Sequence, residues 1–440
     1  MIENKHKEIA RWAMEFALKN GCNASRVSVV TGQNNSIEYR NTQLDKLQQS
    51  SENKLFIEFF VNGRYGSFST NRIEKAELEM SIKNGIASTR FLAEDIFRQL
   101  PHSDRYYKAT KDDDLDLFDA SYYDYTIDQK LDLARATVEE VYQTDSRIVS
   151  VMASFDDGCG SEYFVASNGF EGESRDSAFS LTAEVALKTE SDARPESYWY
   201  DSRVYFSDLQ KSGIAKKALG RAIRKIGQKK IKSGRYTMLL DNTVSLRLFA
   251  PLVSAMYGSA LQQKSSFLIN RLGQQVVSDK LTVIDDPHIH RAFGSRWFDG
   301  EGVATKRQTI INKGVLDMYF IDTYHSLKMN TEPTISSPSV ISAELGTRNF
   351  TELLQSLNKG IWITGFNGGN TNSTTGDFSF GIEGYLVENG VATQPVSEMN
   401  ITGNMLQLWQ NLMEIGCDPR DNSSWRFPSM VFDDINFSGL

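Results

Sequence analysis

The segment at residues 54–69 reads KLFIEFFVNGRYGSFS, and its pattern decides the fold of the N-terminal part of the chain. Two runs rich in aromatic and β-branched residues flank the dipeptide Asn62-Gly63. Asn-Gly is the strongest short signal for a two-residue β-hairpin turn, because both residues tolerate positive φ. We therefore expect a pair of antiparallel strands here. Three further elements are expected around it, namely strands at 26–30 and 36–40 and a helix from about 74 to 98.

The N-terminal part of the chain repeats one order of elements. An amphipathic helix precedes the strands just described. A second helix opens at Thr126, where Gln129 stands three residues on as a capping-box partner, and strands follow it again. Helix, strand, strand and hairpin thus occur near 4–70 and near 127–190. We expect an internal duplication that builds one mostly antiparallel sheet with helices on one face, an α+β domain over residues 1–200.

The second part of the chain has a different pattern. A basic linking helix is expected within residues 201–234, where 211–232 carries nine basic residues and no acidic one. Its lysines are expected to form a solvated face, and contact with an acidic partner or nucleic acid is the alternative. Short strand-like runs and Gly-centred turns then predict a β-rich, barrel-like C-terminal domain over residues 235–440. The few helices expected in this domain lie at 246–261, 350–358 and about 404–414.

Composition and charge exclude several classes of function. A chain of 440 residues exceeds the usual size of a single core, which fits two domains. The formal net charge of −8 argues against direct nucleic-acid binding, because such a surface needs an excess of Lys and Arg. No run reaches the roughly 18 apolar residues of a membrane span, so no membrane partner is expected. Three scattered cysteines and a charged N-terminus without a signal-peptide pattern predict a cytoplasmic protein.

One short motif has the residue types of a metal site. His288 and His290 form H-x-H, preceded by Asp285 and Asp286. Alternate residues of a strand share a face, so these side chains could hold a metal ion with one carboxylate. The spacing has low specificity, and Pro287 interrupts the strand register. Neither a phosphate-binding G-x-x-x-x-G-K-[ST] loop nor a G-x-S-x-G nucleophile motif occurs in the sequence.

Three ordered blocks resemble one known family. They read FDGEGVATKRQTIINKGVLDMYFIDTYHSLK (298–328), TTGDFSFGIEGYLVENG (374–390) and PVSEMNITGN (395–404). The basic segment leading into SGRYTMLLDN (233–242) resembles the stretch before the central helix of that family. With these blocks the chain resembles the TldD/PmbA family, also called modulators of DNA gyrase. The resemblance implies a soluble intracellular zinc metalloprotease assembled from two related subunits.

In the catalytic branch of that family, the helix after the LLDN strand carries H-E-x-x-x-H, and a Cys near the C-terminus completes the zinc site. Two His one turn apart and a thiolate hold Zn²⁺, and the Glu handles the proton of the attacking water. Here the corresponding segment, LRLFAPLVSAMYGSAL (246–261), contains no His, Glu, Asp or Cys, and residues 418–430 contain no Cys. Cys417 is near, but it lies in a block where the family has other residues. The chain therefore resembles the PmbA branch, also called TldE, which lacks the metal motif.

The resemblance implies a function and a set of candidate residues. We expect a metal-free subunit that pairs with a catalytic TldD-type subunit, which carries the zinc, and acts on unfolded peptides; a homodimer is the alternative for the isolated chain. Exposed strand edges near 374–390 are expected to bind an extended peptide by strand addition. The candidate cleft or interface residues are Asp299, Glu301, Gly376, Asp377, Ser379, Glu398, Asn404 and Ala255. Stabilisation of hairpins and turns is an equal alternative for the polar ones.

Two other functions stay open at this point. One is a regulatory binding protein that acts on gyrase or nucleic acid, as the historical name of the family implies. The other is an independent metal hydrolase that uses His288 and His290.

Overall fold

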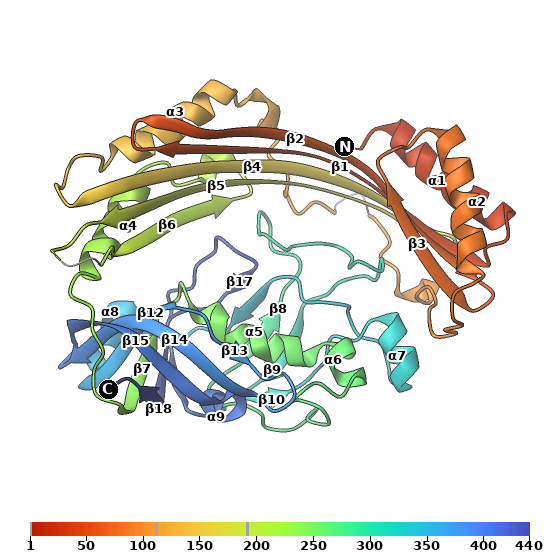
Figure 1. Cartoon of the computed structure of the whole chain (residues 1–440). Helices are drawn as coiled ribbons and strands as arrows, with labels where there is room; N and C mark the ends of the chain where they lie inside the picture. The colour runs from red at the N-terminus through yellow and green to blue at the C-terminus, as the bar shows by residue number, and fades with distance from the viewer. Residues whose placement is uncertain (1, 111–112, 191–192) are drawn as a thin grey trace.

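The chain folds into a long curved sheet that arches over a β-rich C-terminal half (Figure 1). The computed structural model describes residues 2–110, 113–190 and 193–440. The helices and strands of the arch are α1 (Asn4–Lys19), β1 (Ala24–Arg40), β2 (Gln43–Val61), β3 (Arg64–Thr70), α2 (Lys75–Thr89), α3 (Ile127–Glu139), β4 (Ile148–Ala166), β5 (Glu171–Leu187), β6 (Glu196–Arg203) and α4 (Ile214–Arg224). Short 3-10 helices lie at Ser103–Arg105, Tyr122–Asp124 and Phe206–Asp208.

The arch is built from two halves with the same order of elements. Its six strands lie in the order β3-β2-β1-β4-β5-β6, and every neighbouring pair is antiparallel. Apart from the 3-10 helices, each half runs helix, three strands, helix: α1, β1, β2, β3, α2 and then α3, β4, β5, β6, α4. The first strands of the two halves, β1 and β4, meet at the centre of the sheet. The α+β class and the repeated order predicted from the sequence are confirmed.

The hairpin predicted at Asn62-Gly63 is confirmed. It connects β2 to β3, and the two residues have φ of 48° and 74°. Positive φ at both central positions is what a type I′ turn requires. The strands predicted at 26–30 and 36–40, however, are one uninterrupted strand. The reason is nonlocal, since β1 pairs residue by residue with β2 on one side and with β4 on the other.

Strand β2 is much longer than its partner β3. β3 pairs only with residues 55–61 of β2, so residues 43–54 of β2 pair with β1 alone. One edge of this part of β2 is therefore open.

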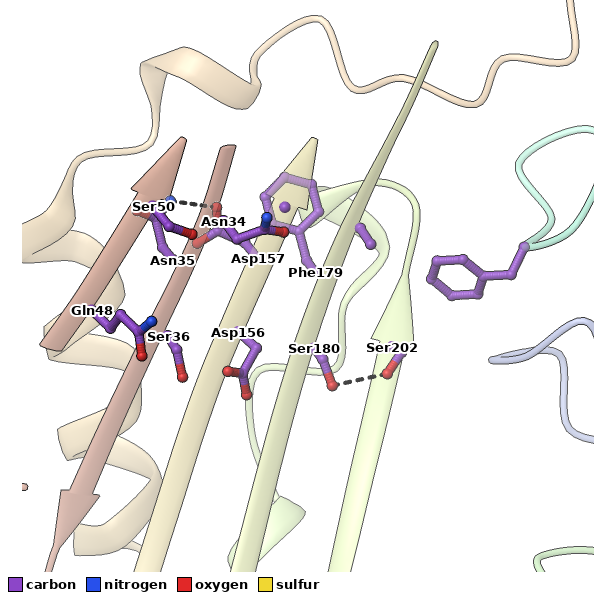
Figure 2. A pocket seen from close by; sticks show the side chains of 13 residues that line it. Asn34, Asn35, Ser36, Gln48, Ser50, Asp156, Asp157, Phe179, Ser180 and Ser202 are labelled. Carbon is purple, nitrogen blue, oxygen red and sulfur yellow. Dashed lines mark hydrogen bonds between the residues drawn. The ribbon is translucent and has the colours of Figure 1, made fainter. Parts of the chain in front are cut away.

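Successive side chains of each strand point to two unlike faces of the arch. On one face, Val27 and Ile57 are fully buried beneath α1 and α2, and Phe155 and Leu181 are fully buried beneath α3 and α4. The opposite face carries mostly polar side chains and looks toward the C-terminal half (Figure 1). Residues of this polar face include Asn34, Ser36, Gln48, Asp156, Ser180 and Ser202 (Figure 2).

The C-terminal half contains many short elements. They are β7 (Gly234–Leu240), α5 (Ser245–Met256), α6 (Gly258–Gln262), β8 (Val283–Asp285), β9 (Gln308–Asn312), β10 (Val315–Leu316), α7 (Thr323–Met329), β11 (Ile341–Ala343), α8 (Phe350–Ser356), β12 (Lys359–Phe366), β13 (Asn370–Thr371), β14 (Asp377–Glu388), β15 (Val391–Asn404), α9 (Met405–Gln410), β16 (Leu412–Ile415), β17 (Trp425–Arg426) and β18 (Met430–Ser438). No helix of the described residues is long and apolar enough to cross a membrane.

Five of these strands close into a barrel. They follow the order β12-β7-β18-β15-β14, and the pairing of β12 with β14 completes the ring. The barrel-like C-terminal half predicted from the sequence is thus confirmed. The prediction of exposed strand edges near 374–390 is wrong, because β14 pairs with β15 on one side and with β12 and β13 on the other. A second sheet, β10-β9-β8-β11-β17, packs beside the barrel in the same hydrophobic cluster.

Four predicted helices differ from the structure in length. The helix expected at about 404–414 ends at Gln410, and β16 begins at Leu412. The helix expected at 246–261 is divided into α5 and α6, because Tyr257 between them is extended, with ψ of 140°. The basic helix expected at 211–232 is α4, which ends at Arg224 and packs on β5 and β6. The helix expected to reach residue 98 ends at Thr89, after which the chain turns back to the β2–β3 hairpin. The division of the chain into domains at residues 200 and 235 stays a prediction.

The buried ion pair between α3 and β4 provides a test of the arch. Lys130 Nζ lies 2.9 Å from Asp157 Oδ2, and the two side chains are 5% and 0% exposed. Lys130→Met is expected to lower the free energy of unfolding by roughly 3–5 kcal/mol, because the carboxylate stays buried without its cation. Arg135→Met is the control, since Arg135 pairs with Asp132 on the exposed side of α3 and should contribute little. Equal urea midpoints for the two variants would contradict this assignment.

Candidate functional site

A cleft lies between the polar face of the arch and the C-terminal half. Three cavities, of about 460, 890 and 330 Å³, are lined by residues from both halves of the chain. They follow the strands β5 and β6: Ser180 and Ser202 line the first, and Glu184, Tyr198 and Tyr200 line the second. Clefts of this size between two parts of a chain are the usual place for a ligand.

The cavity of about 460 Å³ lies on the polar face in the middle of the arch (Figure 2). Ser202 donates a hydrogen bond to the Ser180 hydroxyl at 2.9 Å, across β5 and β6. Gly158 and Ala178 face each other on paired strands and have almost no side chain, while Phe293 of the C-terminal half lies opposite. The lining offers hydroxyl, amide and carboxylate groups but neither His nor Cys. It is therefore suited to hydrogen bonding rather than to nucleophilic chemistry.

The larger cavity, of about 890 Å³, lies where the arch meets the barrel. It is bounded by β6, α4, the first turns of α5 and the end of β12. Its walls combine aromatic and cationic side chains: Tyr198, Trp199, Tyr200, Phe366, Arg194, Arg221, Lys225, Arg247 and Arg420.

Helix α5 lies on the barrel side of this cleft (Figure 1). Leu246, Arg247 and Ala250 line the larger cavity. Ala255, a predicted interface residue, points the other way: it is only 2% exposed and packs in the core of the C-terminal half. Gly258 lies against α7, since a Cβ there would come within 2.8 Å of the His325 Cβ. The small residues of this segment thus allow close packing inside the chain.

The residues of the cleft do not fit a zinc ion. The exposed positions of α5 carry no His, Cys, Asp or Glu, and no group of three or more such residues in the described ranges is placed to hold a metal. The ring of His288 packs on Trp297 with centroids 4.3 Å apart, and its Nε2 lies 3.1 Å from the Thr305 hydroxyl. Burial lowers the pKa of His288, which favours the neutral form of this ring. His288 is therefore packed, whereas His290 is exposed and lines the cavity of about 330 Å³. Within the described ranges the two form no ligand set with a third such residue.

Asp299 stabilises a turn. Its Oδ1 accepts hydrogen bonds from the N–H groups of Glu301 and Val303 at 2.9 and 3.0 Å, and its Oδ2 accepts one from the Ser336 N–H at 2.9 Å. The residue is 2% exposed. All of its partners are backbone groups, so the turn alternative accounts for its contacts.

Glu301 is the one predicted site residue with a strongly shifted pKa. Its Oε2 accepts hydrogen bonds from the N–H and the hydroxyl of Thr323, both at 3.0 Å. Burial raises the pKa of Glu301 to about 7, and the negative charges of Asp299 and Asp322 add to that effect. A carboxyl group that titrates near neutral pH is a feature of many functional sites.

The other candidates gather at one end of the barrel or lie apart from the cleft. Asn404 Nδ2 donates to Asp377 Oδ1 at 3.0 Å, and the Asn404 side chain caps α9. Gly376, with φ of 81°, precedes this pair, and Ser379 is exposed on β14. Glu398 also has positive φ, at 53°, and its carboxylate lies 3.7 Å from Lys230 Nζ. None of the five lines the cavities of about 460 and 890 Å³, and their cleft or interface role stays a prediction.

The residues that line the larger cavity were not predicted as site residues from the sequence. The run SYWYDS at 197–202 was a usable signal, because three consecutive aromatic residues expose at least one ring on each face of a strand. Arg221 belongs to the basic helix, whose lysines were expected to form a solvated face. Arg420 has no local signal at all.

The chain matches three domain descriptions of one family. PmbA/TldA metallopeptidase domain 1 matches residues 26–89, the central domain matches residues 121–226, and the C-terminal domain matches residues 233–439. The chain belongs to the PmbA/TldD metallopeptidase family, as the sequence blocks predicted.

Individual relatives agree with this assignment. A metalloprotease PmbA homologue of Buchnera aphidicola subsp. Baizongia pistaciae is 31% identical over 336 residues, covering 74% of this chain and 73% of the relative. A crystal structure from Bacteroides thetaiotaomicron, of a protein described as a candidate modulator of DNA gyrase, has a TM-score of 0.98 and 52% identity, covering 100% of both chains. TldE from Thermococcus kodakarensis has a TM-score of 0.86, covering 98% of this chain and 100% of that one; its 17% identity shows a shared fold alone.

Glu301→Gln is expected to stabilise the protein at pH 8.5 and to change little at pH 4.5. When folding raises the pKa of a carboxyl group, the free energy of unfolding falls as the pH rises from the ordinary pKa, 4.5, to the folded pKa, about 7. The amide keeps an acceptor for Thr323 and removes the charge. The expected gain at high pH is about 1–3 kcal/mol, measured by urea unfolding at both pH values. Glu332→Gln, at an exposed position, is the control, and a pH-independent effect of Glu301→Gln would refute the assignment.

Ala255→Phe tests the inward orientation of that side chain. Because the site is fully packed, the larger residue is expected to lower the free energy of unfolding by about 1–3 kcal/mol. Ala250→Phe, on the cleft side of the same helix, has room in the cavity and should be tolerated. Thermal unfolding of both variants makes the comparison. An unchanged Tm for Ala255→Phe would place the side chain on a free surface instead.

Proposed function

We propose that this chain is the metal-free subunit of a two-component zinc metalloprotease that acts on unfolded peptides. One observation carries the proposal. The cleft-facing surface of α5, formed by Leu246, Arg247 and Ala250, offers neither a metal ligand nor a carboxylate that could take a proton from water. In the catalytic branch of the family, the corresponding helix is expected to carry both. The chain would thus contribute the walls of a peptide cleft, and a TldD-type partner would contribute the zinc.

An extended peptide suits this cleft better than a folded domain does. Strand β6 is the last strand of the arch, and it borders the larger cavity. The backbone groups on an open strand edge pair with another extended chain, and a folded domain rarely presents one. The polar lining of the cavity in Figure 2 offers further partners for a peptide backbone. Strand addition is therefore proposed at β6 in place of residues 374–390.

The family assignment supports a proteolytic role. The domain descriptions name a metallopeptidase, and the Buchnera relative is named a metalloprotease. Those names imply a metal site, which the cleft-facing residues of α5 cannot form. A partner subunit with an intact metal motif would supply it. The cytoplasm stays the predicted compartment for the complex.

A regulatory binding protein for DNA gyrase is the second candidate, favoured by the description of the Bacteroides thetaiotaomicron structure. The net charge of −8 disfavours a direct contact with DNA. A gel shift of linear DNA at several salt concentrations separates the two candidates. A complex that weakens steeply with salt would favour the binding protein.

The isolated chain is expected to leave an unfolded peptide intact, whereas a mixture with the TldD-type subunit of the same organism is expected to cleave it. The reason is that only the partner would supply a zinc-bound water. A quenched fluorescent peptide reports cleavage by each subunit alone and by the mixture, with and without a chelator. Zinc content of each purified subunit is a second readout. Stoichiometric zinc in this chain, or chelator-sensitive cleavage by this chain alone, would overturn the proposal.

A further inference from the structure

The larger cavity is lined by five cationic side chains and three acidic ones. Of the cationic side chains that line it, Lys225 forms an ion pair with Glu383, at 2.8 Å. Arg221, Arg247 and Arg420 form no ion pair within the described ranges. Their guanidinium groups donate instead to backbone carbonyl oxygens, those of Thr364, Gly369 and Tyr200 at 3.3, 2.7 and 2.9 Å.

Arg420 is held in a fixed orientation. Its guanidinium lies 4.4 Å from the ring centroid of Trp199 and 4.6 Å from that of Tyr200. One Nη2 hydrogen bond to the Tyr200 carbonyl adds to these contacts. A guanidinium has five N–H donors in a rigid fork, so the remaining donors stay available to a ligand in the cavity.

Arg221 has a donor without an acceptor. Its Nε is buried and has no hydrogen-bond partner among the described residues. A buried donor that lacks an acceptor costs free energy, and an anion in the cavity would remove that cost. The Arg221 guanidinium lies 5.4 Å from the Trp199 ring centroid, so it shares this ring with Arg420.

Neighbouring groups of both signs also affect the potential of the cavity. Lys217 Nζ lies 3.6 Å from the Trp199 centroid, and its pKa is lowered by burial and then by the charges of Arg420 and Arg221. Helix α5 begins at Ser245, and Thr243 and Val244 just before it line the cavity, so the positive end of the helix dipole is directed there. The acidic residues Glu184 and Glu196 line the β6 side, where neither forms an ion pair with a described residue.

The open edge of β6 borders the same cavity. The Leu187 N–H donates to the Pro195 carbonyl at 2.9 Å. The backbone N–H and C=O groups of the odd-numbered residues of this segment therefore point toward β5. The carbonyls of Tyr198 and Tyr200 therefore point away from the sheet, as the bond from Arg420 to Tyr200 confirms. A peptide that reaches the guanidinium groups can pair with this edge.

We infer that the larger cavity binds the C-terminal carboxylate of an extended peptide, between Arg221 and Arg420, with the preceding residues along β6. The inference rests on the proposed function, whose substrate it specifies as a peptide with a free C-terminus. Bidentate recognition of a carboxylate is the typical role of such guanidinium groups. Arg247, on the cleft face of α5, adds a third cation near the anion.

Binding to the full chain is measured by fluorescence anisotropy with an N-terminally labelled hexapeptide of fixed sequence, made with a free C-terminal carboxylate and with a C-terminal amide. The amide is expected to bind at least about tenfold more weakly. Arg221→Gln and Arg247→Gln are each expected to weaken binding of the carboxylate form by about tenfold and to leave the amide form unchanged. Arg247 is exposed, so its variant remains informative if Arg221→Gln unfolds the chain. Arg135→Gln, on the exposed side of α3, is the matched control.

Equal affinity for the two peptide forms would overturn the inference. Displacement of the peptide by inorganic phosphate at the same concentration would also overturn it, because the cavity would then bind small anions without recognising a peptide. A carboxylate preference without cleavage by the subunit mixture would leave the site standing and refute the proposed function. Cleavage by the mixture without a carboxylate preference would support the proposed function and refute the carboxylate site.

Discussion

The unbroken pairing of β1 with β4 is the constraint on which the rest of the structure depends. The two strands pair without a register shift from Arg26 opposite Ala166 to Arg40 opposite Met152. Side chains alternate between faces with a period of two, so a slip by one residue would exchange the apolar and polar faces of one half relative to the other. The observed register places the apolar face of both halves under helices. It also creates one continuous polar surface over the barrel.

In this fold, the residues suited to hold a peptide and the helix suited to hold a metal lie on opposite sides of the cleft. The backbone edges and hydroxyl groups that would hold a peptide belong to the arch, whereas the helix that would hold a metal belongs to the barrel. The cleft-facing residues of α5 contribute little to the core, while Leu248, Phe249 and Leu252 on its other side are fully buried. The cleft-facing residues are thus free to differ between family members without loss of the fold, since exposed substitutions rarely change stability much. Metal-ligating side chains at these positions could therefore be replaced without loss of the fold.

Local signals in the sequence were sufficient for elements that depend on local contacts. The Asn62-Gly63 turn has the positive φ values that its residues favour, and the Thr126–Gln129 capping box forms both of its hydrogen bonds. The length of β1 was not predictable, because it depends on partners on both sides. The cationic cavity was missed for the same reason. Arg420 meets Tyr200 across 220 residues of chain, and no spacing rule covers such a contact.

The open edge of β2 at residues 43–54 has a consequence for solubility. Unpaired N–H and C=O groups on a long, flat edge invite a strand from another molecule, which is how many sheets begin to aggregate. Charged side chains interrupt this edge: Asp45 pairs with Arg40, and Lys46 lies near Glu38. Docking a foreign strand here would dehydrate those charges. The charged side chains of β1 and β2 thus disfavour fibril-like stacking at this edge.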